Sequence, residues 1–186
     1  RDGFGQISNS LSKAAEEQGA EILLEAPVRE IRIGGSGKGE VRIHRHGEDS
    51  ILPWDHLWST LPLGPMAGMI RPAPPEEVLS AANALETRAM VLLYLVLDTH
   101  RFSEFDAHYF PSGDIPFTRM SEPKNYSGRD DPMGRTILCV EIPCFRVEPI
   151  WRAGDESLRE LVVEGLARAG LQVRVPIIGV ESRRLP

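Results

Sequence analysis

The sequence has little cysteine, no excess of basic charge and no long apolar run. Two cysteines among 186 residues exclude a disulfide-stabilised scaffold. The longest apolar run covers only residues 89–97, whereas a membrane-spanning helix needs about 20 apolar residues. The 27 acidic residues exceed the 21 basic ones, and the resulting net charge of −6 disfavours non-specific nucleic-acid binding. We therefore expect a cytoplasmic protein with no membrane span and no nucleic-acid partner.

The composition that remains is typical of a folded protein. Hydrophobic residues make up 41% of the chain and charged residues 26%, which is enough apolar material for a buried core. The chain begins with Arg1 in place of a methionine, and it ends at Pro186 without a capped element. Natural chain ends are usually tied down or plainly disordered. We therefore expect this sequence to be an internal piece of a longer protein.

The pattern of apolar residues predicts an α+β fold. The segment 90–98 is apolar on both faces, which is typical of a strand at the centre of a sheet, and the proline- and glycine-rich loops around it favour mostly antiparallel pairing in a mixed sheet. The segment 155–169 reads as a helix that packs on that sheet through Leu158, Leu161, Val162 and Leu166. Further helices are expected at 8–18 and 74–84, and further strands at 21–24, 28–33, 41–46, 56–60, 107–110, 117–120, 136–142 and 173–180.

A proline-rich segment divides the predicted elements into two groups. Three prolines occur within residues 72–75, and we expect a domain boundary there. Residues 1–70 then form one lobe, and residues 75–186 form another.

Three motifs that could hold a phosphate or a metal ion have simpler explanations. The glycine-rich segment 34–39 lacks P-loop spacing and precedes a strand, so it predicts a hairpin turn. His44 and His46 lie two apart on one strand, but no third ligand is near them in the sequence. Cys139 and Cys144 are spaced too widely for a zinc or redox pair, and we expect both to be buried. No metal site is therefore predicted.

The segment 117–126 is chemically unusual, because it combines two cations, an acid and two aromatic residues. The planar guanidinium of Arg119 suits an anionic or planar ligand, although a structural ion pair with Glu122 is an alternative. Glu141 interrupts an otherwise apolar strand and therefore needs a partner, which Arg119 could supply from a neighbouring strand.

Several of these motifs together are similar to a known family. Gly3-Phe4-Gly5 before a helix, then Gly19-Ala20-Glu21-Ile22 and Ser59-Thr60-Leu61-Pro62, resembles the FAD-dependent amine oxidoreductase superfamily. That group includes amine oxidases, phytoene desaturases, protoporphyrinogen oxidases and UDP-galactopyranose mutases. The Thr-Arg…Glu…Lys pattern within 117–126 resembles the mutase and protoporphyrinogen-oxidase-like branch in particular.

The resemblance implies FAD as the cofactor and a different role for each lobe. Residues 1–70 would be part of the FAD-binding lobe, in which the Val28 backbone holds the adenine edge. Residues 75–186 would form most of a substrate-binding domain. The resemblance identifies no catalytic residue. It assigns cofactor binding to Val28, Thr60 and Pro62, and substrate binding to Tyr94, Arg119 and Lys124.

The expected function is that of a middle fragment of a flavin-dependent oxidoreductase that acts on a small molecule. Two alternatives stay open: a UDP-galactopyranose mutase-like isomerase, and a non-catalytic module that binds a ligand or partner. The family's glycine-rich strand–turn–helix for the FAD pyrophosphate does not occur in this sequence. We therefore expect the chain alone to bind FAD weakly or not at all, and to be inactive by itself.

Overall fold

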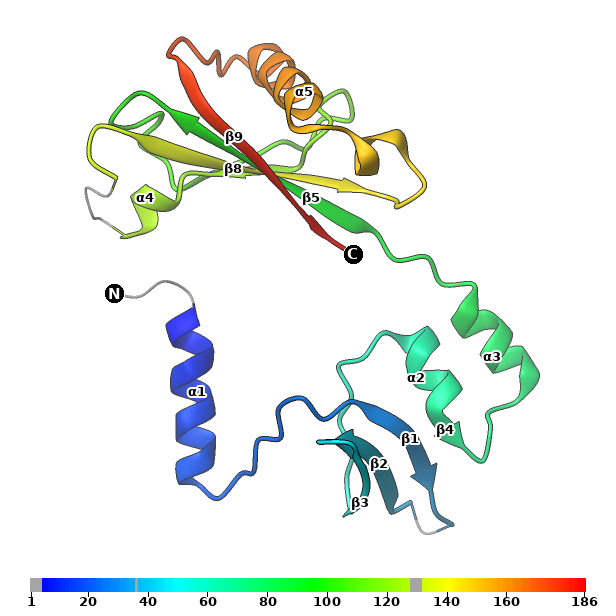
Figure 1. Ribbon diagram of the computed structural model, residues 1–186. Coiled ribbons are helices and arrows are strands. Elements are labelled where there is room, and N and C mark those ends of the chain that lie inside the picture. The colour runs from blue at the N-terminus through cyan, green and yellow to red at the C-terminus, as the bar shows by residue number, and fades with distance from the viewer. Residues whose placement is uncertain (1–4, 36, 128–131) are drawn as a thin grey trace. The chain divides into compact units, whose positions relative to one another are not determined.

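The computed structural model describes residues 5–35, 37–127 and 132–186, which fold into two compact units (Figure 1). The division lies between Glu86 and Thr87, beyond the segment 72–75 at which the sequence predicts it. The helices α2 (Leu63–Met69) and α3 (Glu76–Asn83) on either side of that segment pack against each other. No helix among the described residues is long and apolar enough to cross a membrane.

A four-stranded sheet with the order β3-β2-β1-β4 organises the first unit. The helix α1 (Gly5–Glu17) precedes it and buries none of its own residues. Strand β1 pairs with β2 in antiparallel fashion and with β4 in parallel. The strands are β1 (Val28–Ile33), β2 (Gly39–Arg45), β3 (Glu48–Trp54) and β4 (Ile70–Arg71).

The strand β3 was missed by the sequence analysis because its turn carries no asparagine or aspartate. His46 and Gly47 join β2 to β3 with φ angles of 53° and 86°, as a type I′ hairpin requires. Pro53 is tolerated because β3 lies at the sheet edge. The strands predicted at 21–24 and 56–60 are wrong, since neither segment pairs with a neighbour.

The second unit is built on a five-stranded antiparallel sheet with the order β6-β7-β8-β5-β9. The predicted α+β class with a mostly antiparallel sheet is therefore confirmed, as is the edge position of the last strand. The strands are β5 (Ala89–Leu97), β6 (Ala107–Tyr109), β7 (Arg119–Ser121), β8 (Thr136–Cys144) and β9 (Ile177–Leu185). The helices are α4 (Pro123–Ser127), the 3₁₀ turn η1 (Pro149–Arg152) and α5 (Asp155–Arg168).

One face of this sheet forms the core beneath α5 (Figure 1). Every second residue of β5 and β8 is buried there, and α5 contributes its own buried stripe. Gly165 of α5 is required by this packing, because a Cβ atom would lie 2.6 Å from a ring carbon of Phe117. The most deeply buried residues of the layer are Val91, Leu93, Leu95, Leu97, Phe117, Met120, Leu138, Val140, Ile142, Cys144, Leu158, Val162 and Leu166.

Leu161 is the exception to the predicted helix stripe. It is only partly buried at the rim of the core, whereas Leu158 is 1% exposed. The helix turns by 3.6 residues, so a residue three positions after Leu158 lies toward one side of the buried face.

We predict that Leu158→Ala lowers the free energy of unfolding by about 2–5 kcal/mol, the usual cost of a large-to-small change in a core. Leu161→Ala should cost clearly less, because its side chain already contacts solvent. Urea denaturation of both variants measures the difference. Equal losses in the two variants would contradict the orientation of α5.

Candidate functional site

On the face of the second sheet opposite α5, ionisable and hydrogen-bonding side chains lie among apolar ones. Side chains alternate along a strand, so residues between the core positions of β5 and β8 point to this face, and they are half-buried. We call this surface the open face. The residues that the strand register assigns to it are Met90, Leu92, Tyr94, Val96, Ala107, Tyr109, Arg119, Ser121, Ile137, Cys139, Glu141, Pro143, Gly179, Glu181, Arg183 and Leu185.

Arg119 lies in a polar row that crosses three strands of the open face. It is opposite Tyr109 on β6 and Glu141 on β8, and its Nη2 donates to Glu141 Oε1 over 2.5 Å. The pairing with Glu141 that the sequence suggested is therefore confirmed. Hydrogen bonding to Tyr109, and then to Glu141, raises the pKa of Arg119 further, so its guanidinium stays cationic. Its Nε is buried and has no acceptor within the described part of the chain.

Tyr94 lies in the neighbouring row, opposite Cys139 on β8 and Glu181 on β9. Burial, followed by the neighbouring Cys139, raises the pKa of Tyr94. Burial also raises the pKa of the Cys139 thiol, which lies next to Ser121. Both groups are therefore neutral near pH 7, and Cys139 is not an activated nucleophile. The prediction that Cys139 is buried is wrong, since it is only half-buried on the open face, whereas Cys144 is buried as expected.

A hollow of about 430 Å³ opens beside Tyr94. Gly179 helps to form it, because the glycine lies opposite Val96 and fills no space with a side chain. The walls combine apolar and charged groups: Tyr94, Val96, Ile137, Gly179, Val180, Glu181 and Arg183.

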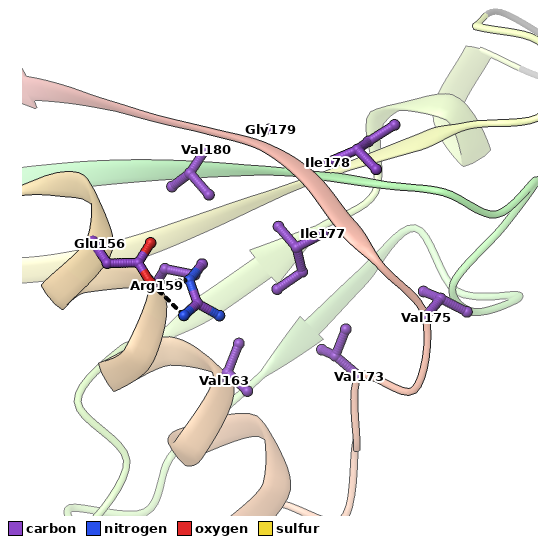
Figure 2. A pocket seen from close by; sticks show the side chains of 9 residues that line it. All are labelled: Glu156, Arg159, Val163, Val173, Val175, Ile177, Ile178, Gly179 and Val180. Carbon is purple, nitrogen blue, oxygen red and sulfur yellow. Dashed lines mark hydrogen bonds and ion pairs between the residues drawn. The ribbon is translucent and has the colours of Figure 1, made fainter.

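A second hollow, of about 510 Å³, lies between α5 and β9 (Figure 2). Figure 2 shows valine and isoleucine side chains around it, with the Glu156–Arg159 ion pair at one side. Its two charged side chains bond each other, and the other residues that line it have no side-chain hydrogen-bonding group, whereas the hollow of the open face also has the Tyr94 hydroxyl. The open face is the better candidate site.

Glu122 does not pair with Arg119, contrary to one alternative from the sequence. It is 2% exposed and accepts hydrogen bonds from the Phe102 and Ser103 backbone amides at 2.9 and 3.0 Å. The Thr136 hydroxyl donates to it as well, over 2.6 Å. The carboxylate therefore fixes the loop after β5 to the start of β8.

Lys124, which the sequence assigned to substrate binding, lies in a similar anchor. It is 4% exposed, and its Nζ donates to the carbonyl oxygens of His100, Pro132 and Arg135 at 2.9–3.0 Å. An ammonium group has three hydrogens to donate. Its ammonium group therefore links the loop that contains His100 to the segment that contains Pro132 and Arg135.

At Val28 the first unit has backbone groups that are not used in pairing with β2. His44 N–H donates to the Pro27 carbonyl over 3.0 Å, so Val28 and Ile43 form a non-hydrogen-bonded pair. The Val28 N–H and C=O therefore point away from β2. On that side, β4 pairs with β1 only at Ile31 and Arg32.

Thr60 and Pro62 lie in the exposed loop that leads into α2. The Pro62 carbonyl accepts the first hydrogen bond of the helix, from Met66 N–H over 3.1 Å. The Ser59 hydroxyl accepts from Leu61 N–H and stabilises the turn before the helix. The loop thus has a defined backbone and an exposed surface.

One histidine of the first unit, His44, pairs with an acid. His44 Nδ1 lies 2.7 Å from Asp49 Oδ1 across the β2–β3 hairpin. Within residues 5–35, 37–127 and 132–186, no three His, Cys, Asp or Glu side chains are grouped as a metal site would require.

We predict that Lys124→Met lowers the free energy of unfolding by at least about 2 kcal/mol, because three carbonyl groups lose a charged donor. Thermal or urea denaturation measures the loss. Lys13→Met is the matched control, since Lys13 is exposed on α1 and should change stability little. A variant as stable as the control would show that the ammonium anchor is unimportant.

Solved structures share this fold over nearly the whole chain. Reduced UDP-galactopyranose mutase matches with a TM-score of 0.74 and 17% identity, over 100% of this chain and 39% of that one. A triple mutant of putrescine oxidase matches with a TM-score of 0.65 and 14% identity, over 96% and 38%. A putative protoporphyrinogen oxidase from Exiguobacterium sp. 255-15 matches with a TM-score of 0.60 and 18% identity, over 95% and 38%.

These identities establish a common fold, and the chain spans about two fifths of the length of each matched structure. No curated protein is significantly similar in sequence. The family model described as flavin containing amine oxidoreductase matches residues 1–182. Nearly all of the sequence fits that one model, so the chain belongs to the flavin-containing amine oxidoreductase family.

Proposed function

We propose that this chain supplies the adenine-side edge of an FAD site and most of the substrate-binding domain of a flavin-dependent oxidoreductase. The observation that carries the proposal is the open face, where Tyr94 and Arg119 present hydrogen-bonding groups among apolar side chains and paired charges. The family membership supports a flavin in the parent protein.

The Val28 backbone groups that are not used in pairing with β2 support the proposed adenine contact. An adenine edge carries a hydrogen-bond donor beside an acceptor, and one outward-facing residue of a strand offers the complementary pair of groups. Val28 meets this requirement because neither its N–H nor its C=O is used in pairing with β2. The residues present therefore fit this part of FAD. We further propose that the loop through Thr60 and Pro62 contributes backbone groups to the same cofactor.

When FAD is bound, it supplies the redox chemistry by accepting a hydride or electron pair. The residues of this chain would bind and orient the substrate on the open face. Tyr94 offers a neutral hydroxyl, and Arg119 offers a cationic donor whose position Glu141 fixes. We propose that Lys124 acts with Glu122 as an anchor of the adjoining loops and contacts no substrate.

The mutase-like alternative is less well supported by the charges. Binding of a nucleotide-sugar diphosphate requires cationic side chains that are free to bond its phosphate oxygens. Arg119 and Arg183 are each already paired with a carboxylate, Glu141 and Glu181. An oxidoreductase that binds its substrate without a diphosphate clamp fits this arrangement better.

We predict that Val28→Pro in the full-length protein weakens FAD binding by about fivefold to tenfold. Proline removes the backbone N–H that would bond the adenine, a loss of roughly 1 kcal/mol. The FAD content after gel filtration and the dissociation constant from flavin fluorescence measure the effect.

Val28→Ala is the matched control, since it shortens the side chain and keeps the N–H. It should bind FAD as the parent does. Unchanged FAD affinity in a stably folded Val28→Pro variant would remove Val28 from the cofactor site.

We predict that Arg119→Lys lowers kcat/KM at least about tenfold, roughly 1.4 kcal/mol, with little change in melting temperature. Lysine keeps the charge beside Glu141 and loses the planar fork. Stopped-flow flavin reduction, with the amine or alcohol that reacts fastest in a screen, measures the effect.

Arg159→Lys provides the control, because Arg159 pairs with Glu156 on α5, on the covered side of the sheet. It should leave flavin reduction unchanged. If Arg119→Lys kept normal kinetics but lost much of its thermal stability, Arg119 would be a structural residue.

A further inference from the structure

We infer that the open face binds an electrically neutral molecule, with an apolar body and a hydrogen-bond acceptor at one end. The inference rests on the proposed function and narrows it, because it names the charge class of the substrate. Three observations support it: compensated charges, available donors, and a hollow whose walls are mostly uncharged.

The charges of the open face cancel in pairs. Arg119 bonds Glu141, and Arg183 Nη2 lies 2.5 Å from Glu181 Oε1. The residues that the strand register assigns to this face therefore include two cations and two carboxylates, each beside its opposite. A charged ligand would lose its hydration without gaining an uncompensated partner, and that loss is costly. A neutral ligand avoids this cost.

The same face still has donors to offer. The side chain of Arg119 is 38% exposed, and Nη2 is the atom that bonds Glu141. A guanidinium carries five N–H groups, so further donors remain at its exposed part. The Tyr94 hydroxyl adds a neutral group that can donate or accept. A carbonyl or ether oxygen on the ligand would satisfy these groups.

The apolar body would lie in the hollow beside Tyr94. Its volume of about 430 Å³ falls within the usual size of small-molecule sites, roughly 300–1,000 Å³. Side chains two apart on a strand are separated by about 7 Å, so Ile137 in the hollow lies about 13 Å from Glu141 beside Arg119. The ligand is therefore elongated, with its acceptor directed toward Arg119.

Three probes with one common body test the charge class. The FAD-loaded full-length protein is titrated with 2-acetylnaphthalene, 2-naphthoate and 2-naphthylmethylammonium by calorimetry. We expect the neutral ketone to bind at least about tenfold more tightly than either ion, a difference of roughly 1.4 kcal/mol. An ion that binds as tightly as the ketone, or a ketone that does not bind below about 1 mM, would overturn the inference.

Gly179→Leu tests the position of the apolar body. A Cβ atom at Gly179 would lie 3.2 Å from Val96 Cγ2, so a leucine side chain there occupies the hollow. The variant should weaken 2-acetylnaphthalene binding at least about tenfold, provided that its melting curve shows a folded protein. Unchanged binding in the folded variant would place the ligand elsewhere.

Glu141→Gln tests the charge compensation directly. The variant leaves the Arg119 cation without its carboxylate, so the affinity for 2-naphthoate relative to that for 2-acetylnaphthalene should rise at least about tenfold. Glu156→Gln is the matched control, because it removes an acid beside Arg159 on the opposite side of the sheet. An equal response of the two variants to naphthoate would contradict the role of Glu141.

Failure of the neutral-ligand inference can be distinguished from failure of the proposed flavoprotein function. If the full-length protein holds FAD but prefers an ionic probe, the charge class is wrong and the flavoprotein function stands. If the protein never binds FAD but binds the neutral ketone more tightly than either ion, the open face is a binding site and the redox function is wrong.

Discussion

The antiparallel pairing of β5 with β8 is the constraint on which the second unit depends. The two strands align over their whole length, from Ala89 opposite Cys144 to Leu97 opposite Thr136. A one-residue slip would exchange the two faces, bringing Glu141 into the core and Val140 to the surface. The apolar face that packs against α5 prevents such a slip, because several fully buried side chains would then become exposed. The same register places Tyr94 beside Cys139, and the pairing of β7 with β8 places Arg119 beside Glu141.

The loops around this sheet are fixed by buried charges. Glu122 binds backbone amides of the loop after β5, and Lys124 binds the carbonyl groups of His100 in that loop and of Arg135 just before β8. Charged groups are rarely buried so completely, and they are tolerated here because each is surrounded by hydrogen-bonding partners. The segment 117–126, in which the sequence indicated a ligand site, therefore has two roles. Arg119 points to the open face, while Glu122 and Lys124 maintain the loops at the sheet's end.

Unlike a typical protein interior, the open face carries charged side chains, but each of them is paired with a group of opposite charge and lies among apolar residues. A flavin enzyme needs the protein mainly to position the substrate and exclude water. Paired charges suit that task, since they orient hydrogen-bond donors without attracting unrelated ions. The same balance argues against a site for diphosphates, although UDP-galactopyranose mutase shares the fold. Similarity of fold therefore leaves the substrate class to be decided by the side chains of this face.

The sequence by itself determined the α+β class and the edge position of the last strand. It also predicted the central strand at 90–98 and the helix at 155–169, each within one residue of the bounds in the structure. These features depend on local patterns: continuous apolar residues, a 3.6-residue period, and a proline within the predicted edge strand. The ion pair of Arg119 with Glu141 was also foreseeable, because an acid within an apolar strand requires a partner. The tertiary structure alone decided that Glu122 and Lys124 are enclosed, since their partners are backbone groups of loops whose positions no local pattern encodes. It likewise decided that one face of β5 is left open and that Gly179 forms a hollow there. Both features depend on which strands become neighbours, and that is set by packing between residues far apart in the sequence.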